Sequence, residues 1–120
     1  MPEFMYLFRG GRPEGSPEQL QKHMQRWVSW IADLSKGGNF KSGDPLENTG
    51  RVVSGTKKSV HDGPYAEAKD LVGGYLLVTA RDLDEATELS KGCPIFEILE
   101  GTGRVGSVEI RQLSAPPPRK

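Results

Sequence analysis

The segment Leu71-Val72-Gly73-Gly74-Tyr75-Leu76-Leu77-Val78-Thr79-Ala80 decides the fold of this 120-residue chain. It is predicted to be a strand with apolar side chains on both faces. Phe4-Met5-Tyr6-Leu7-Phe8 has the same character near the start of the chain. A strand that is apolar on both faces belongs to a sheet that is covered on both sides. Each face of the sheet must therefore have a covering layer.

Two helices are predicted to form the first of these layers. Ser16 is a good N-cap and Gln19 completes a capping box, while Gly37-Gly38 ends this first helix. Its apolar residues recur at heptad-like spacing on one face, at Leu20, Met24, Trp27, Ile31 and Leu34. A second helix begins at Asp82, with acidic residues in its first turn, and Gly92 stops it.

Between the first helix and the apolar segment at 71–80, turn sequences dominate. Residues 39–50 are predicted to be loop, because Gly43-Asp44-Pro45 is a typical turn sequence. Arg51–Ser54 and Lys58–His61 are predicted to pair as a short hairpin.

The order strand, helix, hairpin, strand, helix, strand is typical of an α+β, ferredoxin-like βαββαβ sandwich, here with an extra hairpin. Residues 108–111 alternate like a half-exposed edge strand, and residues 115–120 form a proline-rich tail that we expect to be disordered. One domain therefore spans residues 1–114. Two helices cover only one face of such a sheet, so we predict that a second copy covers the other, in a face-to-face homodimer.

Composition excludes several classes of partner. Sixteen basic and sixteen acidic residues cancel, so nothing predicts binding to nucleic acid or to an anionic membrane. The single cysteine, Cys93, cannot form an internal disulfide and fits a reducing compartment. The apolar run at residues 4–8 is far too short for a signal sequence or a membrane span. We expect a soluble, cytoplasmic protein without metal or cofactor, since its histidines and cysteine lack metal-ligand spacing.

A carboxylate on a tight turn is the most specific local feature. In Val60-His61-Asp62-Gly63-Pro64-Tyr65-Ala66-Glu67, Asp62 precedes a Gly-Pro pair whose backbone is nearly fixed. Such an aspartate serves either as a turn former or as a rigidly presented catalytic group.

This segment resembles the signature of the YCII-related (DGPF-domain) family, with Tyr65 where that family usually has Phe. Further segments that resemble the family are His23-Met24-Gln25-Arg26-Trp27, Ser42-Gly43-Asp44-Pro45-Leu46, Gly73-Gly74-Tyr75 and Gly92-Cys93-Pro94. The resemblance implies a dimeric α+β barrel. It also implies a catalytic His–Asp pair at His23 and Asp62.

Two interpretations of His23 stay open. In one it is a partly buried histidine that is hydrogen-bonded to backbone. In the other, Asp62 fixes its tautomer and leaves the second ring nitrogen to move a proton. His61 is expected on the surface, because neighbouring strand residues point to opposite faces. The residues expected to bind substrate are Trp27, Tyr65, Glu67 and Tyr75.

The sequence thus predicts a small cofactor-independent enzyme of the isomerase or lyase type. Its substrate would be a small cyclic or carbonyl-bearing metabolite, since the family group that the chain resembles includes enzymes that isomerise or dehydrohalogenate lactone-like compounds. The alternative is a non-catalytic module that binds a small ligand or has a regulatory role. The resemblance implies a possible association with transcription machinery through protein contact, because domains of that family also occur beside transcription-related partners. A haem-dependent or oxygen-using enzyme rests on fold analogy alone.

Overall fold

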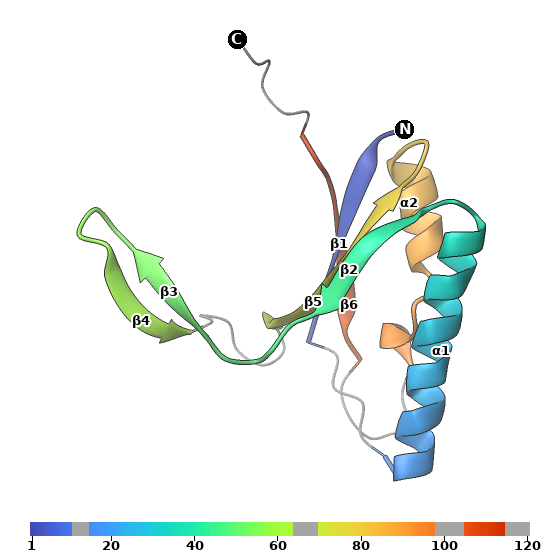
Figure 1. Ribbon diagram of the computed structural model, residues 1–120, viewed down its shortest axis with the longest axis horizontal. Coiled ribbons are helices and arrows are strands. Elements are labelled where there is room, and N and C mark those ends of the chain that lie inside the picture. Colours follow the sequence, from blue (N-terminus) through green and yellow to red (C-terminus); the bar gives the residue numbers. More distant parts are fainter. Residues whose placement is uncertain (11–14, 64–69, 98–104, 115–120) are drawn as a thin grey trace.

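The computed structural model describes residues 1–10, 15–63, 70–97 and 105–114. The predicted tail at 115–120 lies outside the described residues. Along the chain the elements are β1 (Glu3–Arg9), α1 (Pro17–Lys36), β2 (Phe40–Pro45), β3 (Gly50–Ser54), β4 (Ser59–Gly63), β5 (Val72–Thr79), α2 (Leu83–Ser90), the 3-10 turn η2 (Pro94–Phe96) and β6 (Ser107–Gln112) (Figure 1).

Four strands form one antiparallel sheet in the order β2-β5-β1-β6, with both helices on the same side. This confirms the predicted ferredoxin-like α+β fold. The two apolar segments lie side by side at the centre, where Tyr6 of β1 is level with Leu76 of β5 and Ile110 of β6.

The predicted loop at residues 39–50 is wrong in its first half, because β2 pairs with β5 along the edge of the sheet. Gly43-Asp44-Pro45 carries turn residues into a strand, which hides it from a pattern search. The exposed edge tolerates the proline. Gly43 is required by close approach: a Cβ there would collide with the Leu76 side chain and lie 2.5 Å from the Tyr75 carbonyl oxygen.

Both helices begin where the sequence predicts. Ser16 accepts a hydrogen bond from the Gln19 amide at 3.2 Å, and the Gln19 side chain accepts one from the Ser16 amide at 2.7 Å. Asp82 caps α2 by accepting from the Glu85 amide at 2.8 Å. These caps satisfy backbone donors that have no partner inside a helix.

The core lies between the helices and the sheet. Phe4, Tyr6 and Val78 are fully buried, and Trp30 of α1 stacks on Tyr6 with ring centroids 6.2 Å apart. The Tyr6 hydroxyl donates to the carbonyl oxygen of Ala86 and so ties β1 to α2. Burial raises the pKa of Tyr6 to about 12.

Neither α1 nor α2 covers the opposite face of the four-stranded sheet. Burial alternates along β1 and β5, which turns Met5, Leu7, Tyr75 and Leu77 toward this side, where they are half-buried. We call these four residues the open face.

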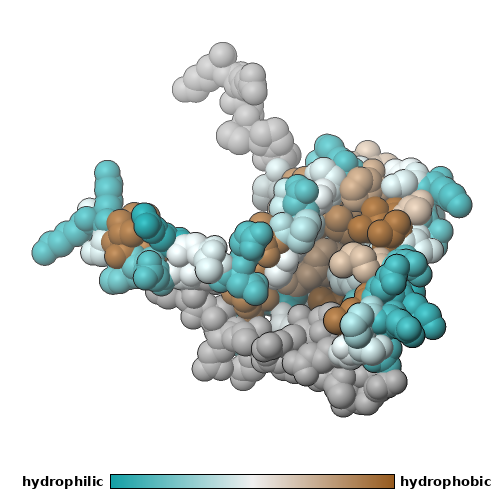
Figure 2. All heavy atoms as spheres, turned by 60° about the horizontal axis from the view of Figure 1, so that its bottom comes forward, coloured by the Kyte–Doolittle hydropathy of each residue, from teal (hydrophilic) through white to brown (hydrophobic). Residues whose placement is uncertain are grey.

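β3 and β4 form a separate two-stranded sheet that projects away from the body (Figure 1). We call residues 50–63 the arm. Val53 and Val60 lie opposite each other in its register and are 62% and 58% exposed. Figure 2 shows apolar atoms on the arm, surrounded by hydrophilic ones and apart from the body. The predicted hairpin is confirmed.

Candidate active site

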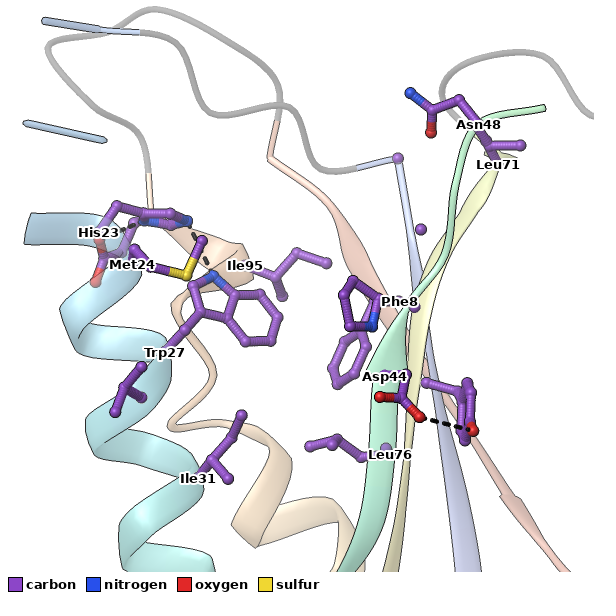
Figure 3. Close-up of a pocket in the computed structure, with 18 residues that line it drawn as sticks. Phe8, His23, Met24, Trp27, Ile31, Asp44, Asn48, Leu71, Leu76 and Ile95 are labelled. Atoms are coloured by element: carbon purple, nitrogen blue, oxygen red, sulfur yellow. Dashed lines mark hydrogen bonds and ion pairs between the residues drawn. The ribbon is translucent and has the colours of Figure 1, made fainter. Parts of the chain in front are cut away.

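A cavity of about 660 Å³ lies between α1 and the sheet, beside the β2 edge. Most of its walls are apolar, and Figure 3 shows the side chains of the helix and the sheet facing one another across it. Its main apolar lining residues are Phe8, Met24, Trp27, Ile31, Leu76 and Ile95. A mostly apolar cavity with few polar groups is the usual form of a small-molecule site.

His23 is one of the polar residues that line this cavity, together with Asp44, Asn48 and Glu97. It lies in the first half of α1 and is 6% exposed. Its Nδ1 lies 3.2 Å from Oε2 of Glu97, and its Nε2 accepts a hydrogen bond from Nε1 of Trp27 at 3.0 Å. Trp27 follows His23 by one helical turn, which brings the two side chains together on one face. The predicted alternative in which His23 bonds to backbone is wrong.

The carboxylate beside His23 is itself held by an arginine. Nε of Arg26 donates to Oε1 and Oε2 of Glu97 at 2.6 and 2.8 Å. The hydrogen bond from Arg26 is the main cause that lowers the pKa of Glu97, the bond with His23 adds to it, and partial burial opposes both. Glu97 is therefore a carboxylate at neutral pH.

Trp27 forms the aromatic wall of the cavity. Its ring meets Phe8 edge-on, with centroids 5.2 Å apart and an interplanar angle of 83°. Trp30 lies behind it at 5.8 Å and donates its own Nε1–H to the Leu89 carbonyl oxygen. An indole wall of this kind suits a flat or cyclic ligand.

The structure does not bring Asp62 and His23 together within one chain. Asp62 lies on β4, level with Arg51 of β3, and is exposed on the arm. His61 beside it is exposed as well, as the sequence predicts.

The residues expected to bind substrate divide into three groups. Trp27 lines the cavity. Tyr75 is also among the lining residues, but its side chain turns toward the open face, where its hydroxyl lies 3.4 Å from Oδ2 of Asp44. Tyr65 and Glu67 lie outside the described residues.

Sequence reasoning missed Glu97 as the partner of His23. The two are 74 positions apart, and Glu97 belongs to no periodic pattern. One signal was present: Arg26 follows His23 by three residues on the same helix, so a carboxylate near one of them is drawn to both.

The thiol of Cys93 is a further titratable group with a shifted pKa. Cys93 is buried, and burial raises the pKa of its thiol to about 12.

Within the described part of the chain, no three His, Cys, Asp or Glu side chains are grouped to hold a metal ion. None of the described helices combines the length and apolarity needed to cross a membrane.

Comparison with known proteins matches the chain to a family and to solved structures. The model of the YCII-related domain matches residues 4–114. A solved structure that is similar is 5-chloro-2-hydroxyhydroquinone dehydrochlorinase from Burkholderia phenoliruptrix AC1100, in complex with 2,5-dihydroxybenzoquinone. The identity is 19% and the TM-score 0.41, over 91% of each chain. No curated protein matches the chain. At this level of likeness, no residue's role passes from that enzyme to this chain.

Proposed function

Because the chain belongs to the family of YCII-related domains, we propose that it is a small cofactor-independent enzyme of the isomerase or lyase type. His23 moves a proton on a small cyclic or carbonyl-bearing metabolite. The observation that supports this is a nearly buried histidine in an apolar cavity, with a carboxylate on one ring nitrogen. A carboxylate in that position orients the ring and stabilises the imidazolium that forms when the other nitrogen takes a proton.

Within one chain, Glu97 takes the orienting role that the family motif implies for Asp62. Its contact with Nδ1 and its anchoring by Arg26 support this assignment. We propose that Asp62 acts at the site of a second copy of the chain, because the arm that carries it projects away from its own body.

The proposed assembly is a cytoplasmic homodimer that pairs the open faces of two copies. Met5, Leu7 and Leu77 support it, because an apolar sheet face needs cover. In Figure 1 the arm projects from the side of the sheet opposite the helices, so a copy docked on the open face lies next to the arm.

One observation favours the alternative, a module that binds a small ligand without catalysis. Both ring nitrogens of His23 are already engaged, one by Glu97 and one by Trp27. A histidine held on both sides also serves to shape a pocket.

Turnover separates the two functions. The purified protein is assayed against lactones and halogenated ring acids, with His23→Ala and with His61→Ala as the matched control on the arm. We expect His23→Ala to lose about 10²- to 10⁴-fold in kcat/KM, the usual contribution of a proton shuttle, and His61→Ala to keep the wild-type value. Full turnover in His23→Ala contradicts the mechanism. Ligand binding that survives His23→Gln, without turnover in the wild type, favours the module.

A further inference from the structure

The hydrogen bonds around His23 determine which of its ring nitrogens carries the proton. An indole N–H can only donate. Since Trp27 donates to Nε2, that nitrogen holds a lone pair rather than a hydrogen. The neutral ring then carries its hydrogen on Nδ1, which faces Oε2 of Glu97 at 3.2 Å. A carboxylate accepts this hydrogen, so the two contacts agree on one tautomer.

Arg26 makes this arrangement stable against reversal. It donates to both carboxylate oxygens of Glu97. A protonated Glu97 would compete as a donor toward Nδ1, and the arginine disfavours that form. The pair therefore presents an acceptor to Nδ1 and leaves Nε2 as the acceptor of the ring.

From this geometry we propose that His23 enters its reaction as a proton acceptor through Nε2, and that Trp27 is a gate whose indole N–H holds that nitrogen until a ligand hydrogen-bond donor replaces it. The proposal deepens the proposed function and rests on it. It names the ligand class: an apolar or aromatic ring that bears an acidic hydroxyl or a comparable X–H group. In the step itself the X–H bond breaks, its electron pair stays on X, and the proton forms the Nε2–H bond. The imidazolium keeps its Nδ1–H toward Glu97.

The surroundings of the gate fit this ligand class. Trp27 lies between His23 and Phe8, and both contacts are edge-on. Beyond it, Ile31, Leu76 and Ile95 continue the apolar wall. A ligand ring that enters this cavity therefore finds His23 and Glu97 at the end beside Trp27, and both present hydrogen-bond acceptors.

Nuclear magnetic resonance tests the proposal on the intact protein without a known substrate. Nitrogen-15 spectra of the histidine rings report the tautomer, with His61 as an internal reference. We expect His23 to be the Nδ1–H tautomer at neutral pH. An Nε2–H tautomer overturns the proposal, and this measurement needs no variant.

Two matched probes then test the gate. Phenol carries a hydroxyl donor, and anisole is the same ring with the donor blocked by a methyl group. Phenol is expected to shift the indole N–H resonance of Trp27 clearly more than anisole does at equal occupancy, because only phenol displaces this N–H from Nε2, while the resonance of Trp30 stays in place. Equal responses to the two probes, or no response to either, overturn the proposal.

The variant Trp27→Phe removes the N–H and keeps an aromatic ring. Without a hydrogen bond to displace, its preference for phenol over anisole should rise about two- to tenfold, the range of one hydrogen bond's net free energy. An unchanged preference in a folded variant overturns the gate. The expected tautomer and gating without turnover would support the gate and the ligand class, and would contradict the proton transfer and with it the enzyme. Turnover with the opposite tautomer would support the enzyme and contradict this proposal.

Discussion

Glu97 carries a charge whose contribution to stability depends on pH. Its pKa is lowered in the folded chain, mainly by Arg26, below the ordinary value of 4.5. The contribution is therefore fully present above pH 4.5 and is lost as the pH falls through the lower folded value. We expect Glu97→Gln to lower the free energy of unfolding at pH 6, and the difference from wild type to shrink toward pH 3.

Urea unfolding at several pH values measures this difference. Glu88→Gln is the matched control, because Glu88 pairs with Lys91 at 2.8 Å on an exposed part of α2. Exposed pairs contribute little, so its effect should be small and nearly independent of pH. A difference for Glu97→Gln that stays constant down to pH 3 would contradict the role of its charge.

Cys93 is predicted to be unreactive in the folded protein. Burial holds the pKa of its thiol at about 12, against an ordinary 9.0. The reactive thiolate is therefore scarce at neutral pH, and reagents cannot reach it. Since the unfolded thiol ionises first, its contribution to stability is present below pH 9.0 and falls as the pH rises toward 12.

Labelling with an aromatic disulfide reagent at pH 8 tests this. We expect the native protein to react at least about 100-fold more slowly than the unfolded chain, because reaction waits for opening of the core. Ser59→Cys in a Cys93→Ala background places a thiol on the exposed arm and should react at once. Fast labelling of native Cys93 would show that its surroundings open readily.

Among the elements, β2 depends most on a single residue. A Cβ at Gly43 would meet both the Leu76 side chain and the backbone of β5. We expect Gly43→Ala to cost about 1–3 kcal/mol, as overpacking usually does. Gly73→Ala is the control on the neighbouring strand, because a Cβ there meets nothing within 4 Å. Equal unfolding free energies for the two variants would contradict the close approach of β2.

The elements also show what sequence alone predicts. The first turn of α1 was predictable because Ser16 and Gln19 act within three residues of each other. β2 was not, because its pairing with β5 depends on residues 29 to 38 positions away. The site divides in the same way: His23 and Trp27 share a helix face, whereas Glu97 reaches them only through the fold.

At the scale of the whole molecule, the arm makes the single chain extended. Its radius of gyration is 16.5 Å, against about 14 Å for a compact chain of this length. A two-stranded hairpin is also only marginally stable by itself in water. Both facts favour the second copy that we propose on the open face.

Sedimentation equilibrium tests that assembly. The wild type should have twice the chain mass of 13.2 kDa. Leu77→Asp should shift the equilibrium toward monomer, because burying an unpaired charge in the interface is costly. Leu83→Asp, on an exposed part of α2, should leave the mass unchanged. A monomeric wild type would contradict the dimer.

The placement of Trp27 and Trp30 also allows the pocket to be followed by tryptophan fluorescence. They are the two tryptophans of the chain; one lies on the cavity wall and the other lies behind it in the core. Indole emission responds to the polarity and the hydrogen bonding of its surroundings. Intrinsic fluorescence therefore reports occupancy of the cavity and integrity of the core at once, so a library of compounds can be screened on the unlabelled protein before any reaction is known.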